Sequence, residues 1–101
     1  MKITLERLKK ATKEFDKVCS KYAKCGAADS EPGYVFNDYA RIVIETGEVA
    51  LPGKEGWDLY YEAVPCGIAH RALTSSAKKV YELLAVAPAS VTREYKDYYD
   101  L

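Results

Sequence analysis

The first 25 residues show the clearest pattern of apolar and polar positions in the chain. Apolar side chains recur there at spacings of three and four, and they are Leu5, Leu8, Ala11, Phe15, Val18, Tyr22 and Cys25. Such spacing brings these side chains onto one face of an α-helix. Thr4 is a suitable N-cap residue, and Gly26 suits the position after the last turn. The pattern therefore predicts an amphipathic N-terminal helix.

The middle of the chain predicts a β-hairpin. Pro32-Gly33 is a strong turn signal at the end of a segment of small and polar residues. After it, β-branched and aromatic residues gather in three short runs, which are residues 34–36, 41–44 and 49–51. The glycine-bearing turn Thr46-Gly47 separates the second run from the third, an arrangement typical of antiparallel strands. Residues 57–64 fit either a further strand or a helix, and their aromatic residues favour the strand.

The last third of the chain predicts two helices. Pro65 suits the first position of a helix, and apolar residues then follow at mostly helical spacing: Ile68, Ala72, Ala77, Val80, Leu84 and Ala87. Gly67 weakens this start, and Thr74-Ser75-Ser76 would instead cap a helix that begins near residue 76. Ala87-Pro88 ends this helix, because the residue before a proline avoids the α conformation. Ser90 is a suitable N-cap for a final helix over residues 91–99. The order of elements predicts an α+β fold, with a small antiparallel hairpin or three-stranded meander between helices.

Length and composition fit one compact domain over residues 1–101. The chain has 49% hydrophobic and 30% charged residues, which excludes wholesale disorder. No apolar run approaches the ~20 residues that span a membrane, and the charged segment after Met1 does not have the pattern of a secretory signal peptide. Three cysteines, an odd number, argue against a disulfide scaffold. We therefore expect a cytoplasmic protein.

A net charge of zero conceals a strong segregation of charge along the chain. Residues 1–25 hold eight basic side chains against three acidic ones, whereas residues 26–65 hold two basic against eight acidic ones. Segregation of this kind bears on association and partners rather than on fold. It fits a polar, two-sided surface. It also fits two parts that attract each other, within one molecule or between copies, and the second case would give a homodimer.

The basic part of the chain supports a nucleic-acid hypothesis. Five lysines form a stripe opposite the apolar face of the first helix: Lys10, Lys13, Lys17, Lys21 and Lys24. Lysine stripes contact phosphates and release counterions. Base recognition usually uses Arg, Asn or Gln, and this helix has only Arg7 among these types. The alternative interpretation is a solvated lysine face without a ligand.

Tyrosine is unusually abundant, with nine tyrosines against two phenylalanines. A buried phenol needs a hydrogen-bond partner, whereas a phenol at an interface combines contact area with tolerance of water. On a helix, Tyr95 shares a face with Tyr98 or Tyr99, and this face either packs on the core or is exposed. Tyrosines near the acidic hairpin are the better candidates for an exposed contact patch.

Candidate chemistry is sparse. Cys66 lies four residues before His70, the only histidine, so the two share a helix face and suit a metal or a thiolate–imidazole pair. A zinc site needs about four ligands, and no further cysteine has the matching spacing. A buried thiol beside a partly exposed histidine is the simpler interpretation. We therefore expect no metal, no other cofactor and no catalytic residue.

These observations favour a small protein-interaction module, such as an adaptor, an inhibitor or an assembly factor. Small phage or mobile-element proteins that block host machinery have this size and this lack of catalytic motifs. The predicted binding surface for a basic partner protein is acidic and rich in tyrosine, and consists of Asp38, Tyr39, Glu45, Glu48, Asp58 and Tyr60. The alternative is a nucleic-acid-binding accessory protein that uses the five-lysine stripe.

Overall fold

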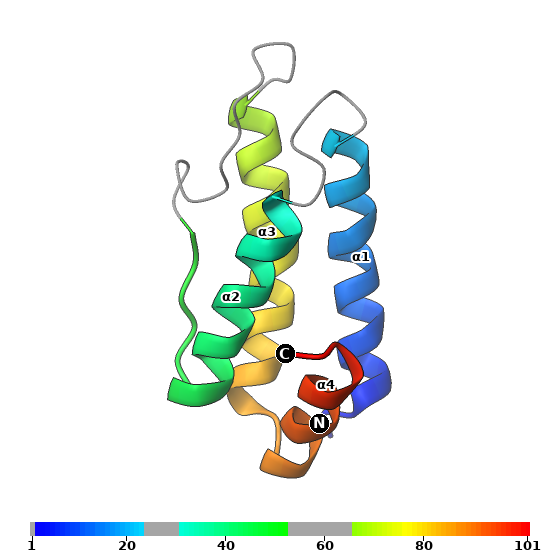
Figure 1. Ribbon diagram of the computed structural model, residues 1–101, viewed down its shortest axis with the longest axis vertical. Coiled ribbons are helices and arrows are strands. Elements are labelled where there is room, and N and C mark those ends of the chain that lie inside the picture. The colour runs from blue at the N-terminus through cyan, green and yellow to red at the C-terminus, as the bar shows by residue number, and fades with distance from the viewer. Residues whose placement is uncertain (1, 24–30, 53–65) are drawn as a thin grey trace.

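Four helices make up the part of the chain that the computed structural model describes, which is residues 2–23, 31–52 and 66–101. They are α1 (Leu5–Ala23), α2 (Glu31–Thr46), α3 (Cys66–Val86) and α4 (Ala89–Tyr98). The long helices α1 and α3 lie side by side and run in opposite directions (Figure 1). Helix α2 packs against both of them from one side, and the short α4 lies across the lower end next to α1.

The predicted β-hairpin is wrong, and so is the α+β fold class. The first two predicted strands, at 34–36 and 41–44, lie inside α2, and residues 49–51 form neither helix nor strand. The described ranges contain no strand, so the fold they form is all-α. Residues 57–64, which fitted either a strand or a helix, lie outside the described residues.

The helical period of α2 explains this correction. Its buried residues Phe36, Ala40 and Val43 recur at spacings of four and three, so one face of the segment is buried as a helix. β-branched residues such as Val35 and Ile42 raise strand propensity. That propensity is weak compared with the burial of a complete apolar face, and packing therefore decides the conformation.

The helix ends are fixed by local hydrogen bonds. The predicted cap of α1 is confirmed, because Thr4 Oγ1 accepts a hydrogen bond from the Arg7 backbone N–H at 3.3 Å. Gly47, predicted to be in a hairpin turn, instead ends α2: its φ is 73°, and its N–H donates to the Val43 carbonyl at 2.8 Å. Pro88 caps α4, so the predicted cap Ser90 is wrong and lies in the first turn.

A column of three stacked aromatic rings joins α1, α2 and α3. Phe36 from α2 stacks on Phe15 from α1 at a centroid distance of 4.2 Å and on Tyr81 from α3 at 5.2 Å. All three side chains are buried. The Tyr81 hydroxyl donates to the Phe36 carbonyl at 2.8 Å, so the one polar atom of the column is satisfied. This column fixes which face of α2 is buried.

A buried pair of hydroxyls attaches α4 to α1. Thr12 Oγ1 donates its only hydrogen to the Leu8 carbonyl at 2.8 Å, so its oxygen accepts from the Tyr95 hydroxyl, which lies 2.8 Å away. Tyr95 is buried, which confirms the interpretation that this face of the last helix packs on the core. Tyr98 does not pack on the core in this way, because 59% of its surface is exposed.

We predict that Thr12→Val lowers the free energy of unfolding by about 1–3 kcal/mol, because it leaves the Tyr95 phenol buried without an acceptor. Adding Tyr95→Phe removes that phenol, so the double variant loses less than the two single losses combined. Urea denaturation of the wild type, the two single variants and the double variant measures this coupling.

The control Thr92→Val removes a comparable hydroxyl bond, which Thr92 donates to the Ala89 carbonyl at an exposed position of α4. It is expected to change stability by within about 0.5 kcal/mol. Strictly additive losses would contradict the buried pair.

Alkaline pH is predicted to destabilise the fold through Tyr81 and Tyr95. Burial raises the pKa of both phenols, and the Thr12 hydrogen bond lowers that of Tyr95 only in part. The unfolded chain ionises its tyrosines near pH 10, so it releases these protons first. The stability they contribute is therefore complete below about pH 10 and is lost as the pH rises further.

Urea midpoints measured at about pH 8 and about pH 11 test this dependence. The wild type is expected to lose more stability between the two values than Tyr95→Phe, which has one buried phenol fewer. An equal loss in both proteins would show that Tyr95 makes no contribution to the alkaline transition.

Candidate functional site

The outer face of α2 combines exposed apolar and acidic side chains. Its inner face is buried against α1 and α3, whereas Tyr34 is 64% exposed and Ile42 is 40% exposed. Asp38 and Glu45 are exposed on the same side of the helix, because positions 34, 38, 42 and 45 are spaced by four, four and three. We call Tyr34, Asp38, Ile42 and Glu45 the α2 outer face.

One ion pair organises this face. Arg41 Nη1 lies 2.7 Å from Asp38 Oδ1, one turn apart on the helix. Both side chains are largely exposed, so the pair adds only a few tenths of a kcal/mol to stability. The Asp38 side chain is 67% exposed and is therefore accessible to a partner. With two acidic side chains and one basic side chain, this stretch of α2 is acidic.

The structure brings together part of the predicted acidic binding surface. Asp38 and Glu45 lie on the α2 outer face, and Glu48 is exposed just beyond the helix, where its N–H donates to Thr46 Oγ1. Tyr39 is half-buried and packs against the core, so it lies off this face. Asp58 and Tyr60 lie outside the described residues.

Sequence reasoning missed the two exposed apolar residues of the face. The predicted strands at 34–36 and 41–44 place Tyr34 and Ile42 in different strands and leave Asp38 in the segment between them. The signal that finds them is the period of four that joins Tyr34, Asp38 and Ile42.

The lysine stripe lies on the solvent-exposed side of α1, as its spacing predicted. The side chains of Lys10, Lys13, Lys17 and Lys21 are exposed, and Lys24 lies outside the described residues. A shallow hollow of about 610 Å³ is lined by residues of this side: Lys13, Asp16, Lys17, Ser20 and Lys21. Lys17 also pairs with Glu14 at 3.6 Å. The hollow is basic overall, with one carboxylate among three ammonium groups.

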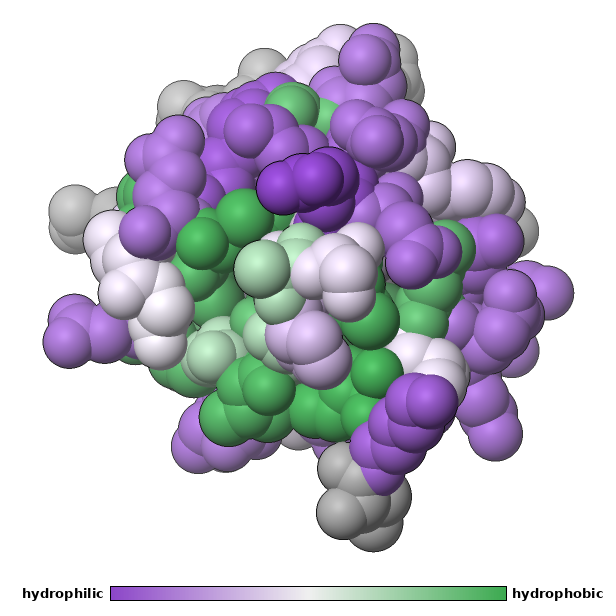
Figure 2. All heavy atoms as spheres, turned by 90° about the horizontal axis from the view of Figure 1, so that it is seen from below, coloured by the Kyte–Doolittle hydropathy of each residue, from purple (hydrophilic) through white to green (hydrophobic). Residues whose placement is uncertain are grey.

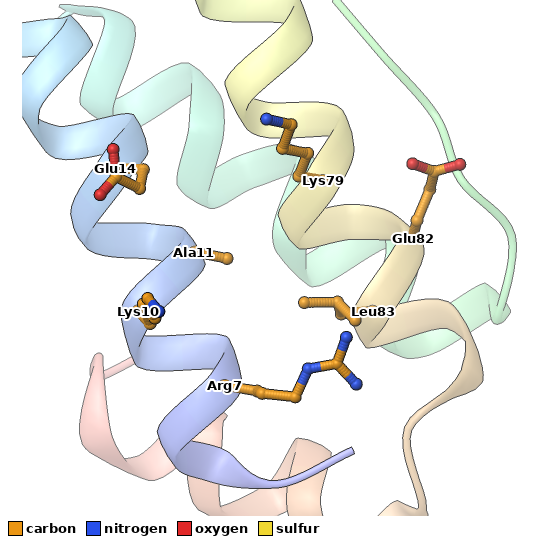
Figure 3. A pocket seen from close by; sticks show the side chains of 7 residues that line it. All are labelled: Arg7, Lys10, Ala11, Glu14, Lys79, Glu82 and Leu83. Atoms are coloured by element: carbon orange, nitrogen blue, oxygen red, sulfur yellow. The ribbon is translucent and has the colours of Figure 1, made fainter. Parts of the chain in front are cut away.

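A groove of about 500 Å³ lies between α1 and α3. Its lining comes from both helices and consists of Arg7, Lys10, Ala11, Glu14, Lys79, Glu82 and Leu83. Figure 3 shows this groove with α2 behind the two helices, so it opens on the opposite side of the molecule from α2. Ala11 and Leu83 are half-buried and form its apolar floor. The small side chain of Ala11 leaves the space that makes the groove.

Apolar side chains also gather at the lower end of the molecule, which faces the viewer in Figure 2. Val86, at the end of α3, is 71% exposed, and the adjoining Pro88 and Ala89 are exposed as well. Near this end, Lys9 Nζ lies 4.0 Å from the centre of the Tyr98 ring, a cation–π contact that covers one ring face. The junction of α3 and α4 thus exposes a small apolar patch.

The titratable groups of α1 do not form a nucleophilic site. Cys19 is a half-buried free thiol, and burial, followed by the charge of Asp16, raises its pKa. Burial also raises the pKa of the Asp16 carboxyl. A thiol with a raised pKa is protonated at neutral pH and is a poor nucleophile.

Cys66 and His70 stand one turn apart at the start of α3, but their side chains are outside the described residues. Among the residues that are described, no three His, Cys, Asp or Glu side chains come together as a metal site. None of the helices described here is long and apolar enough to cross a membrane.

Comparison with known protein families, with curated proteins and with solved structures finds no match to this chain.

Proposed function

We propose that this protein is a small, non-enzymatic interaction module that binds a basic partner protein through the α2 outer face. An adaptor, an inhibitor or an assembly factor would use such a surface. The observation that carries the proposal is the exposure of Tyr34 and Ile42 beside two acidic residues, on a helix whose other face is buried. We place the protein in the cytoplasm on the basis of its odd number of cysteines.

The chemistry of the α2 outer face favours a protein partner. Apolar side chains that stay exposed in the monomer supply area that is buried on binding. Tyr34 is well suited to this role, because tyrosine gives a large contact area and still tolerates water. Asp38 and Glu45 flank Ile42 and would steer a basic surface into register.

The partner is therefore expected to present an apolar side chain or pocket surrounded by Lys or Arg. The inner face of α2 is locked by the aromatic column, so binding requires no rearrangement of the fold. A preformed helix face of this kind loses little conformational entropy on association.

Reversal of the two acidic charges tests this proposal. Asp38→Lys combined with Glu45→Lys is expected to remove partner proteins that the immobilised wild type captures from nuclease-treated lysate. The matched control is Glu94→Lys with Asp97→Lys, which makes the same charge change on exposed residues of α4. Mass spectrometry of the bound proteins is the measurement, after far-UV circular dichroism has shown that each variant is folded.

The expected outcome is a set of proteins that depends on the α2 charges, is retained by the α4 control and is released by salt. A bound set that is identical for both variants would contradict the proposal.

A second candidate function is nucleic-acid binding by α1. It is favoured by the basic hollow, in which Lys13, Lys17 and Lys21 lie on one exposed side of the helix. A phosphate group in this hollow would contact ammonium groups one turn apart. This candidate has less support, because exposed Asp16 lines the same hollow and the sequence as a whole is neutral.

Filter binding of single- and double-stranded nucleic acid at low salt tests this second candidate. Lys13→Glu with Lys17→Glu is expected to abolish binding, since each phosphate contact contributes counterion release. The control Lys78→Glu with Lys96→Glu makes an equal charge change elsewhere and should leave binding within a few-fold of the wild type. Equal losses in both variants would show only a general charge effect.

A further inference from the structure

The groove between α1 and α3 has a distinct arrangement of inward-pointing side chains. In Figure 3, Ala11 and Leu83 point toward each other across its floor. Arg7 reaches toward α3 from one end, and Lys79 reaches toward α1 from the other. The two acidic residues of the lining, Glu14 and Glu82, point away from the groove. The space inside is therefore apolar in the middle and cationic at both ends.

Helix geometry accounts for this placement. Arg7 stands four residues before Ala11 on α1, and Lys79 stands four residues before Leu83 on α3. Four residues are about one helical turn. Because α1 and α3 run in opposite directions, the two cations flank the apolar floor on opposite sides, about one turn away in each case.

Neither Arg7 nor Lys79 forms an ion pair with a described acidic residue. The ion pairs among the described side chains join Lys9 to Glu6, Lys17 to Glu14 and Arg41 to Asp38, and none of them includes Arg7 or Lys79. A ligand that fits the groove therefore has an apolar side chain with a carboxylate about one turn to either side. An amphipathic helix with acidic flanks meets this requirement.

The α2 outer face has this pattern. Ile42 is exposed, Asp38 stands four residues before it and Glu45 stands three residues after it. On a helix, both carboxylates lie about one turn from Ile42 on the same side. The apolar centre and its two anionic flanks correspond in order and spacing to the apolar floor and two cationic ends of the groove.

We infer that the α1–α3 groove is the docking site for the α2 outer face of a second copy of this chain, with Ile42 seated against Ala11 and Leu83. This inference rests on the proposed function, since it names a partner for the same binding face. Charge complementarity supports it: the groove is cationic and the α2 outer face acidic.

The positions of the two surfaces determine the form of the assembly. The groove opens on the side of the molecule opposite α2, so one copy cannot satisfy its own groove (Figures 1 and 3). Two different surfaces meet, so a docked pair still has one free groove and one free α2 outer face. Association is therefore head-to-tail, and it continues beyond a dimer unless a ring closes.

Sedimentation velocity over a range of protein concentrations tests this inference. The average mass of the wild type is expected to rise past that of a dimer at low salt. It should return to that of a monomer near 1 M salt, where the screening length falls to about 3 Å. The groove variant is Arg7→Gln with Lys79→Gln, and the α2 variant is Asp38→Asn with Glu45→Gln. Each is expected to stay monomeric at concentrations where the wild type associates.

Matched controls separate specific docking from a general charge effect. Lys13→Gln with Lys17→Gln changes the charge as the groove variant does, and Glu94→Gln with Asp97→Asn changes it as the α2 variant does. Both controls should associate like the wild type. All these positions are exposed, and far-UV circular dichroism checks that each variant is folded.

An equimolar mixture of the groove variant and the α2 variant provides the sharpest readout. One intact groove and one intact α2 outer face remain in the mixture, so it is expected to form one-to-one complexes and nothing larger. The inference would be overturned if the groove variant and the α2 variant, each measured alone, associated as strongly as the wild type. It would also be overturned if the charge-matched controls lost as much association as these two variants. A wild-type dimer unaffected by either variant would also overturn it and would point to the apolar end at Val86.

The outcomes also distinguish this inference from the proposed function. A wild type that is monomeric at every concentration, yet captures other proteins through Asp38 and Glu45, overturns the inference and leaves the proposed function standing. Self-association that depends on both surfaces, with no α2-dependent protein captured from lysate, supports the inference and limits the binding face to copies of this chain.

Discussion

The stacked column of Phe15, Phe36 and Tyr81 is the interaction on which the rest of the structure depends. It joins α1, α2 and α3, and its one polar atom is satisfied by a hydrogen bond to the Phe36 carbonyl. Because Phe36 is held in this column, α2 has a single rotational setting. That setting buries Ala40 and Val43, and it also decides which residues of α2 face water.

The exposed surface follows from this constraint. With α2 covering one side of the α1–α3 pair, the groove is left on the other side, so the groove and the acidic α2 outer face lie on opposite sides of the molecule. A neutral chain thus acquires a basic groove and an acidic helix face. Among the described residues, the basic side chains of α1 and the acidic side chains of α2 stand on separate helices that pack through their apolar faces, so the segregation of charge along the sequence is kept in the fold.

Much of the fold could be predicted from the sequence where the signals are local. The period of α1, its Thr4 cap and the stop at Pro88 depend on nearby residues, and each is present in the structure. Helix α2 was missed because β-branched residues dominated the interpretation of a segment whose conformation is decided by packing against Phe15 and Tyr81. Asp38 and Glu45 were recognised as exposed acids, but Tyr34 and Ile42 join them only once the segment is a helix. The groove was beyond sequence reasoning, since Ala11 and Leu83 meet only after α1 and α3 pack.

In the proposed assembly, the α2 outer face of one copy docks in the α1–α3 groove of the next. Backbone amide chemical shifts, measured by NMR as the protein concentration is raised, test this claim most directly. If the two surfaces dock, the amide resonances of Asp38, Ile42 and Glu45 shift together with those of Ala11 and Leu83, while the resonances of α4 stay constant. Shifts confined to one of the two surfaces, or centred on the junction of α3 and α4, would contradict it.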